Sequence, residues 1–208
     1  MFNASDGTSL VNAAKSASTD FPEITMLILK VHTEKASDKD KLYTMAPNPD
    51  NAAVSQYGMI TLNDIKGHLS SLADISEQGR YVMLSVGMFA RAYRITTGQL
   101  GIAESSVVFD YPSACHCPPG ICELRTGDPY DSMDVTVEVW DQKMLVFFDS
   151  AKQMVTRAKS RLDALPKNYS GIAAYNVEMD DFDGSCDGAK KFERLGVIRE
   201  QIANAKEP

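Results

Sequence analysis

The sequence predicts an α/β fold with parallel strands, and three observations carry this prediction. Three apolar runs have strand length and the composition of strands buried on both faces of a parallel sheet: residues 24–31, 81–89 and 171–179. Four segments place apolar residues at helical spacing: residues 5–19, 61–79, 150–165 and 192–202. Strands and helices alternate along the chain, as they do in α/β domains.

The first half of the chain is expected to hold two helices, one strand and a loop. Ser and Asp residues stand at the start of the first helix, where they can cap its free N–H groups. Residues 36–53 are rich in Asp, Lys, Pro and Asn, which predicts a loop. Thr61 is the expected cap of the second helix, and Gly79 ends it. The apolar positions of that helix are Leu62, Ile65, Leu69, Leu72 and Ile75.

The second half changes character after the second strand. Residues 94–132 combine turn-forming residues, prolines and three cysteines. A half-exposed strand follows, because three valines alternate with polar residues: Val135, Val137 and Val139. Asp149 or Ser150 caps the next helix, which leads to the third apolar strand. A final amphipathic helix completes the alternation.

Composition excludes several classes of function. The chain has 208 residues, of which 44% are hydrophobic and 24% charged, as in ordinary globular proteins. Its 21 basic and 28 acidic residues give a net charge of −7. This balance argues against nucleic acid as a partner and against a basic membrane-binding surface. No apolar run approaches the roughly 18 residues that a membrane span needs.

The cysteines suggest a secreted protein, although the sequence starts without a visible signal peptide. Two Asn-x-Ser tripeptides, at Asn3 and Asn168, would suit the same interpretation. Four cysteines allow three disulfide connectivities, and spacing alone does not choose among them. A zinc cluster is a poorer interpretation, because the spacing of the group matches no usual tetrahedral zinc pattern. The four cysteines are Cys115, Cys117, Cys122 and Cys186.

Acidic residues after the third strand do not predict a metal site. Placing Asp181 and Asp183 in a calcium-binding loop would put Met179 and Lys190 at ligand positions, and neither side chain suits calcium. We expect Asp180, Asp181 and Asp183 to cap the last helix instead, where carboxylates meet the positive end of the helix dipole. The sequence therefore predicts neither a metal nor a cofactor.

Residues 171–186 resemble the end of the barrel of glycoside hydrolase family 18. The run Gly-Ile-Ala-Ala-Tyr-Asn-Val-Glu-Met-Asp-Asp-Phe, followed by Cys186, is similar to the last strand of that family, Gly-x-Met-x-Trp-x-x-Asp-x-Asp-Asp-Phe. Residues 81–93 resemble its strand ending Gly-x-Pro-x-Tyr-Gly-Arg-x-Phe, and residues 145–152 its aromatic-Asp-Asp stretch. Residues 28–33 occupy the place of its Met-x-Tyr-Asp strand end. The order and spacing of these matches agree.

This resemblance implies a partial (β/α)8 barrel, with strands six to eight of the family present. Residues 1–208 would form one such domain, and residues 94–144 an inserted α+β subdomain. A complete barrel typically takes about 250 residues, so 208 residues suggest that the front of the barrel is missing. Such a piece would leave two strand edges and one sheet face uncovered, and we expect it to be poorly stable or to self-associate.

The resemblance also predicts that catalysis is lost. The family's signature, Asp-x-x-Asp-x-Asp-x-Glu, is absent, and the acidic run at residues 128–138 has the wrong spacing and lies in the insertion. Glycoside hydrolysis needs a carboxylic acid that protonates the leaving oxygen. The sequence thus offers no catalytic residue. If the chain is active, the activity would be that of a chitinase.

Four residues align with the family's sugar site and are predicted to bind ligand: His32, Phe89, Arg91 and Tyr175. His32 replaces the tyrosine of the sixth strand, Phe89 that of the seventh, and Tyr175 the tryptophan that floors the site, whereas Arg91 is retained. Structural roles are the alternatives. Phe89 and Tyr175 would fill the barrel interior, His32 would lie at a loop edge, and Arg91 would pair with Asp180 or Asp181.

These observations lead to a working hypothesis with two alternatives. The chain is expected to be an extracellular, non-catalytic, lectin-like protein that binds chitin or N-acetylglucosamine oligosaccharides. A secreted module that binds another protein is one alternative, and the C-terminal part of an active chitinase is the other. The resemblance further implies a disulfide between the insertion and the end of the last strand, for which we select Cys122 and Cys186.

Overall fold

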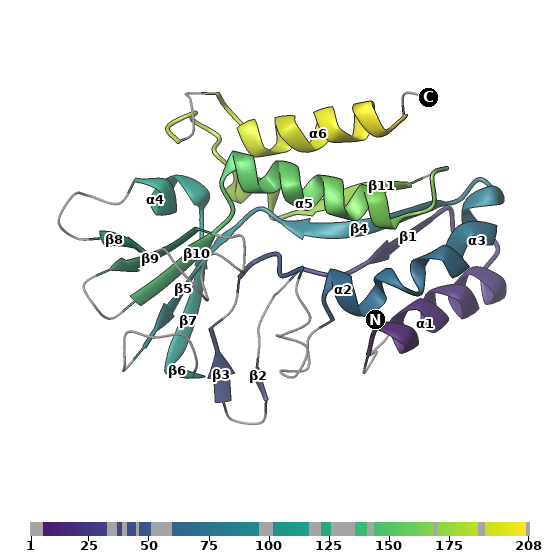
Figure 1. Ribbon diagram of the computed structural model, residues 1–208, viewed down its shortest axis with the longest axis horizontal. Helices are drawn as coiled ribbons and strands as arrows, with labels where there is room; N and C mark the ends of the chain where they lie inside the picture. Colours follow the sequence, from purple (N-terminus) through teal and green to yellow (C-terminus); the bar gives the residue numbers. More distant parts are fainter. Residues whose placement is uncertain are drawn as a thin grey trace.

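The strands of this protein fall into three separate sheets (Figure 1). The computed structural model describes residues 6–32, 37–38, 41–44, 46–50, 60–95, 102–116, 122–125, 136–140, 144–168, 170–186 and 190–206, with only the backbone for β2, β8 and β9. The parallel sheet has the order β1-β4-β11, and an antiparallel sheet has the order β7-β5-β10-β9-β8. A third small sheet has the order β2-β3-β6.

The bounds of the elements are as follows. The strands are β1 (Met26–Leu29), β2 (Ser37–Asp38), β3 (Lys41–Tyr43), β4 (Tyr81–Gly87), β5 (Ala90–Arg94), β6 (Ile102–Ala103), β7 (Ser105–Phe109), β8 (Cys122–Arg125), β9 (Thr136–Trp140), β10 (Met144–Phe148) and β11 (Ser170–Tyr175). The helices are α1 (Gly7–Asp20), α2 (Leu62–Lys66), η2 (Leu69–Leu72), α3 (Ala73–Glu77), α4 (Tyr111–Cys115), α5 (Ala151–Ala164), η4 (Val177–Met179) and α6 (Glu193–Lys206). No described helix is long and apolar enough to cross a membrane.

The central strand of the parallel sheet is β4. Its residues Tyr81 to Leu84 pair with β1, and Val82 to Gly87 pair with β11. The three predicted buried strands therefore lie side by side, although they are far apart in the sequence. This sheet brings the carboxyl ends of all three strands to one edge, which is where ligand sites form in parallel α/β folds.

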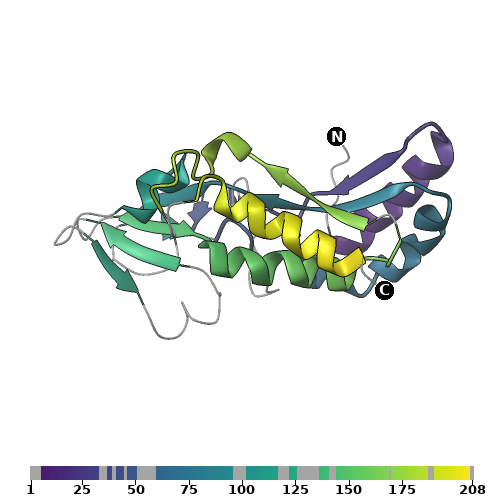
Figure 2. The ribbon, with the colours of Figure 1, turned by 90° about the horizontal axis from the view of Figure 1, so that it is seen from above.

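Within the described part of the chain, helices cover only one face of the parallel sheet. Helices α1, α2 and η2 pack against the apolar side chains of β1 and the first half of β4, including Leu29 and Leu84. Helices α5 and α6 lie side by side over the rest of the sheet and pack against Val86 and Ile172 (Figure 2). The apolar faces of the amphipathic helices are thus buried against one face of the parallel strands.

The opposite face of the parallel sheet, here called the open face, carries the alternate side chains of the same strands. Its members are Met26, Ile28, Tyr81, Met83, Ser85, Ala173 and Tyr175. Met26, Ile28, Tyr81 and Tyr175 are 36–46% exposed, which is high for large apolar side chains in a sheet. The sequence runs are apolar on both faces, but the residues that the structure describes cover only one of them.

The central strands β5 and β10 of the antiparallel sheet, in contrast, are buried on both faces. One face packs Tyr93, Leu145 and Phe147 into a cluster with Ala46 and others. The other face packs Ala92, Val146 and Phe148 against α4. The ring of Tyr93 meets that of Phe147 edge-on, with centroids 5.6 Å apart.

Several predicted elements need correction. The helix predicted for residues 61–79 is divided into α2, η2 and α3, with a turn at Gly67 and His68. The predicted loop at 36–53 contains two short strands, β2 and β3. Ser150, and not Asp149, caps α5, because its hydroxyl accepts the backbone N–H of Gln153. The third apolar run is a strand only as far as Tyr175, since Asn176 adopts a left-handed conformation and a single 3-10 turn follows.

Candidate functional site

The carboxyl end of the parallel sheet brings together three of the four predicted ligand-binding residues. Beyond the end of β1, the backbone N–H groups of Val31 and His32 donate hydrogen bonds to Oγ of Ser85, at 2.8 and 3.2 Å. The His32 ring also contacts this hydroxyl, with Nδ1 and Oγ 2.7 Å apart. One serine in the centre of the sheet thus holds both the backbone and the ring of His32.

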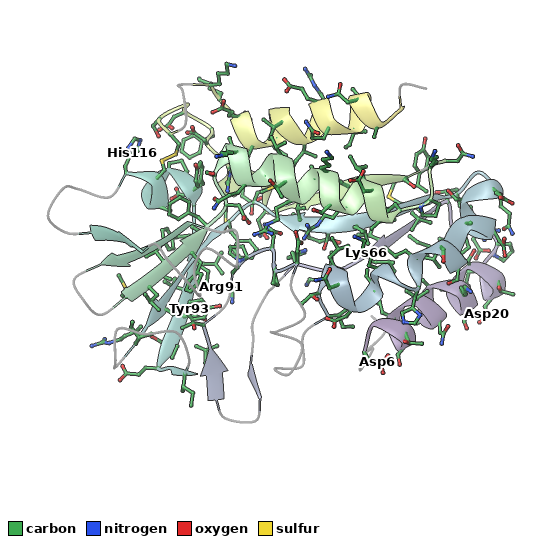
Figure 3. All side chains as sticks on the ribbon, viewed as in Figure 1. Asp6, Asp20, Lys66, Arg91, Tyr93 and His116 are labelled. Atoms are coloured by element: carbon green, nitrogen blue, oxygen red, sulfur yellow. A yellow bond between two sulfur atoms is a disulfide. The ribbon has the colours of Figure 1, made fainter. Side chains whose placement is uncertain are left out.

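Aromatic rings surround His32. The Tyr175 ring lies 4.7 Å from the His32 ring, between centroids and at a tilt of 41°, and the Phe89 ring lies edge-on at 6.3 Å. Arg91 lies on β5 of the antiparallel sheet (Figure 3). Its guanidinium carbon is 5.3 Å from the centroid of the Phe89 ring. Tyr175 is 36% exposed, whereas His32, Phe89 and Arg91 are buried. Only Tyr175 of the four therefore presents a large ring surface to solvent.

The predicted pairing of Arg91 with Asp180 or Asp181 is wrong. Asp180 forms a 2.6 Å ion pair with Nε of Arg194, and both side chains are buried. Asp181 accepts the backbone N–H groups of Ser185 and Cys186. Nε of Arg91 is buried and has no hydrogen-bond partner among the described residues.

The acidic cluster caps the last helix in part. Asp180 accepts the backbone N–H of Leu195, in the first turn of α6, at 3.3 Å. Asp181 and Asp183 instead bond to the turn at Ser185, so the prediction is confirmed for Asp180 and wrong for the other two.

A buried polar network, which the sequence reasoning missed, lies beside the aromatic group. Its members, here called the arginine network, are Asn48, Asp50, Asp149, Arg157 and Arg161. The Asn48 amide accepts the N–H of Gly87 and donates to its carbonyl and to Asp149. Gly87 is the register partner of Tyr175, so Asn48 supports the end of the sheet where Tyr175 lies.

Two arginines of α5 complete this network. Arg157 pairs with Asp149 at 3.2 Å and Asp50 at 2.9 Å, and Arg161 pairs with Asp50 at 2.8 Å. Nε of Arg161 donates to the carbonyl of Ser85, the same residue that holds His32. Burial lowers the pKa of the Arg161 guanidinium, and the charge of Asp50 opposes that shift. In the sequence, Arg157 and Arg161 are four residues apart, a spacing that places two side chains on the same face of a helix.

Arg194 joins the parallel sheet to the antiparallel region. Besides its ion pair with Asp180, it donates hydrogen bonds to the carbonyls of Met88 and Asp149. Its guanidinium carbon lies 3.8 Å from the ring centroid of Tyr111 in α4. Asp149 and Asp180 are therefore each engaged by a buried arginine.

The disulfide joins Cys115 to Cys186, so the predicted pairing of Cys122 with Cys186 is wrong. It still connects residues 94–144, the predicted insertion, to the segment after the last strand, because Cys115 ends α4. Cys115 is partly buried against the cluster that covers the antiparallel sheet, which places it beside Cys186. Cys122 lies in β8, of which only the backbone is described, and Cys117 lies outside the described residues.

The same region contains one group of potential metal ligands. Atoms of Cys115, His116 and Cys186 lie within 4.8 Å of one another, and Figure 3 shows His116 beside the disulfide. Both sulfurs belong to the disulfide, and zinc binding by cysteine requires thiolates. The oxidised protein therefore lacks the donors that such a site would need.

No protein-family model matches the sequence, and no curated protein matches it. Solved structures do match the fold. Group IV chitinase from Ostrinia furnacalis, in complex with allosamidin, has a TM-score of 0.61 and 14% identity, over 97% of this chain and 64% of that chain. Human YKL-39, described as a pseudo-chitinase with retained chitooligosaccharide binding, has a TM-score of 0.58 and 14% identity, over 95% and 64%.

A family 18 chitinase from Cycas revoluta, also in complex with allosamidin, gives a TM-score of 0.54 and 7% identity, over 96% of this chain and 62% of that chain. This chain spans less than two thirds of the length of each of these three proteins. The resemblance inferred from residues 28–33, 81–93 and 171–186 is thus confirmed at the level of the fold. The chain has the α/β fold seen in chitinases and chitinase-like proteins of glycoside hydrolase family 18.

Proposed function

We propose that this chain is a non-catalytic, chitinase-like protein that binds N-acetylglucosamine oligosaccharides at the carboxyl end of its parallel sheet. In this proposal β1, β4 and β11 are strands six to eight of a (β/α)8 barrel. Residues 94–144 form an α+β insertion within one domain, 1–208. The proposal includes an extracellular location, which the disulfide supports, because disulfides persist in oxidising compartments.

The exposed ring of Tyr175 is the observation that carries this proposal. Tyr175 is the last residue of β11, at the carboxyl end of the sheet, where ligands bind in parallel α/β folds. The His32 ring packs against it, with the two ring centroids 4.7 Å apart. Sugar rings present apolar C–H faces, and aromatic surfaces in ligand sites supply the matching contact. Ser85 fixes His32 in turn, so the ring of Tyr175 lies against a rigid support.

The buried members of the group have supporting roles in this proposal. Phe89 meets the His32 ring edge-on and contacts the guanidinium of Arg91, and these two residues form the wall of the proposed site. Arg91 has a buried Nε without a hydrogen-bond partner among the described residues, so it has capacity for a polar group of a ligand. YKL-39 gives independent support, since a pseudo-chitinase with a similar fold retains chitooligosaccharide binding.

A matched pair of variants tests the binding site. Tyr175→Ala removes the ring at the carboxyl end of the open face, whereas Tyr81→Ala removes a ring of similar exposure at the amino end. In calorimetric titrations with chitotetraose, Tyr175→Ala is expected to weaken binding at least about tenfold, which equals 1.4 kcal/mol. Tyr81→Ala should leave affinity within about twofold. Equal losses in the two variants, or no binding by the unmodified protein, would reject the site.

The non-catalytic part of the proposal has its own test. The protein is incubated with a fluorogenic N-acetylglucosamine oligomer, and release of the fluorophore is compared with a buffer blank. We expect no release above the blank, because this sequence does not contain the family's signature Asp-x-x-Asp-x-Asp-x-Glu, which supplies the catalytic acid. Turnover that is lost in Tyr175→Ala would show that the chain is a hydrolase.

A further inference from the structure

We propose that Ser85 holds His32 as a neutral tautomer with the ring hydrogen on Nε2, and that acid releases this ring and weakens the candidate ligand site. The inference rests on the proposed function for its effect on sugar binding, whereas the protonation state of His32 follows from hydrogen bonds alone. Both side chains are buried, with Ser85 0% and His32 5% exposed.

The Ser85 hydroxyl has room for three hydrogen bonds, and each position is used. A hydroxyl offers one hydrogen and two lone pairs. The backbone N–H groups of Val31 and His32 donate to Oγ at 2.8 and 3.2 Å, and they fill both lone pairs. The third contact, between Oγ and Nδ1 of His32 at 2.7 Å, is left to the hydroxyl hydrogen. The hydroxyl therefore donates, and Nδ1 accepts.

An accepting Nδ1 fixes the protonation state of the ring. Neutral imidazole has one donor and one acceptor nitrogen, whereas the charged ring has two donors. Because Nδ1 of His32 accepts, Nε2 carries the hydrogen and the ring is neutral. The other tautomer, like the charged ring, would direct a third N–H at an oxygen whose lone pairs are taken. It would also leave the buried Ser85 hydroxyl hydrogen unbonded, which is costly.

The two partners of this hydrogen bond both depart from the family motifs of the sixth and seventh strands. With Arg91 aligned to the arginine of Gly-x-Pro-x-Tyr-Gly-Arg-x-Phe, Ser85 stands at the first glycine. His32 stands at the tyrosine of Met-x-Tyr-Asp. Glycine has no side chain, so a sequence with the motif residues could not form this bond.

Acid opposes this arrangement. A proton added to His32 converts Nδ1 into a donor, and the ring must then turn away from the Ser85 hydroxyl. Only the released ring accepts the proton without losing a hydrogen bond, so linkage makes protons favour release. Release removes the ring that packs 4.7 Å from Tyr175. Binding that uses Tyr175 is therefore expected to weaken as the pH falls through the range in which histidine titrates.

The charged and titratable groups around His32 agree with this direction. Arg91, from β5, packs on the phenylalanine ring that meets His32 edge-on, and it repels a second cation there. On the side of α5, Arg161 and Asp50 form an ion pair whose charges balance. Tyr175, from β11, contributes a phenol. Among these types of side chain, only histidine ordinarily changes its charge between pH 5 and 8.

Nuclear magnetic resonance of the ring nitrogens tests the protonation state in the unmodified protein. The chain has three histidines, and the exposed His68 and His116 are assigned through their glutamine variants. At about pH 7.5 we expect His32 to show a hydrogen on Nε2 and none on Nδ1, and at about pH 5 to lose its nuclear Overhauser contacts with Tyr175. A hydrogen on Nδ1, averaged tautomers, or contacts that persist at the lower pH would overturn the proposal.

Serine variants test whether the Ser85 hydroxyl holds the tautomer. Ser85→Ala should let His32 average its two tautomers, and Ser85→Thr, which retains a hydroxyl, should keep Nε2 protonated. The matched control is Ser76→Ala, since Ser76 is also buried but donates to the carbonyl of Asn168. It should leave the His32 resonances unchanged. A fixed tautomer in Ser85→Ala, or equal averaging in Ser76→Ala, would overturn the proposal. Circular dichroism confirms that the variants fold.

Calorimetric titrations with chitotetraose test the effect on the ligand site. Affinity of the unmodified protein should fall at least about fivefold between pH 7.5 and 5, the loss expected for one hydrogen-bonded support. His32→Asn keeps an oxygen acceptor near the Nδ1 position and does not titrate, so its affinity should change less than about twofold over this range. The control His68→Gln should keep the full fall.

The outcomes separate this inference from the proposed function. Affinity that does not depend on pH in the unmodified protein, or an equal fall in His32→Asn, would overturn the acid effect. Absence of chitotetraose binding at both pH values would reject the proposed function. The ring resonances of His32 and its contacts with Tyr175 would then decide the inference by themselves.

Discussion

The two main sheets of this protein reverse the usual relation between sheet type and covering. Parallel sheets are normally buried on both faces, whereas antiparallel sheets often leave one face in water. Here the central strands β5 and β10 of the antiparallel sheet have apolar clusters on both faces, whereas the described residues cover only one face of the parallel sheet. The parallel sheet instead draws on buried ionic contacts near its carboxyl end, around Ser85 and Gly87. In the antiparallel region, the ion pair between Arg94 and Glu104 lies at the surface.

The largest expected effect concerns the junction between the two regions. Arg194→Met leaves the buried carboxylate of Asp180 without its cation and removes the bonds to Met88 and Asp149. We expect a loss of about 3–5 kcal/mol in the free energy of unfolding, measured by urea titration. The double variant Arg194→Met/Asp180→Asn should recover part of that loss. A loss below about 1 kcal/mol would mean that the junction does not depend on this ion pair.

The Cys115–Cys186 disulfide also connects the two regions. Its removal should lower the free energy of unfolding somewhat less than Arg194→Met does. Cys115→Ser/Cys186→Ser opens a link between residues 71 positions apart. Loops of this length are stabilised by about 2–4 kcal/mol when closed, mainly through the unfolded state. Thermal unfolding of the double variant, compared with the oxidised protein, measures the loss. An unchanged midpoint would show that Arg194 alone maintains the junction.

The cap of α5 tests how strongly this helix determines the covering of the parallel sheet. Ser150→Ala removes a hydroxyl that accepts the N–H of Gln153, and with it one half of a capping box. The expected loss is about 1 kcal/mol in urea titrations. Ser150→Asp retains an acceptor and should restore most of that loss. If the alanine variant loses more than about 3 kcal/mol, the cap must also support the arginine network.

The smallest effect is expected at the surface of the antiparallel sheet. Arg94 and Glu104 form an ion pair at 3.4 Å, with side chains 63% and 51% exposed. Arg94→Met should change the free energy of unfolding by less than about 1 kcal/mol, because water and salt screen exposed charges. The contrast with Arg194→Met sharpens the comparison between regions. Similar losses in the two variants would break it.

Local patterns predicted the elements more successfully than the contacts between them. Apolar runs identified β1, β4 and β11, and helical spacing identified α1, α5 and α6. These signals are local, since burial of one face imposes a period on the sequence. The short strands β2 and β3 were missed because runs of two and three residues are too short to show that period, and the long helix was predicted without the break at Gly67.

The sequence predicted the residues of the candidate site that belong to a family motif. It did not predict those that join the site through polar contacts with residues far away in the sequence. Alignment with family motifs identified His32 and Tyr175, which the fold places in contact. Asn48 and Asp50 lie in a segment whose composition indicated only a loop, and their partners are 39 to 111 residues away. The wrong partners for Arg91 and Cys186 share this cause, because charge and cysteine content do not encode which distant residues meet.

The long-range bonds of Asn48 have a consequence for the order of folding. They reach across 39 residues to Gly87 and 101 to Asp149, and contacts that close such large loops form after local helices. In stopped-flow measurements we expect Asn48→Ala to speed unfolding and to leave the refolding rate within about twofold. Refolding that slows in proportion to the loss of stability would instead place Asn48 in the nucleus. Formation of the carboxyl end of the parallel sheet is thus expected to be the closing step of folding, after the helices and the antiparallel sheet have formed.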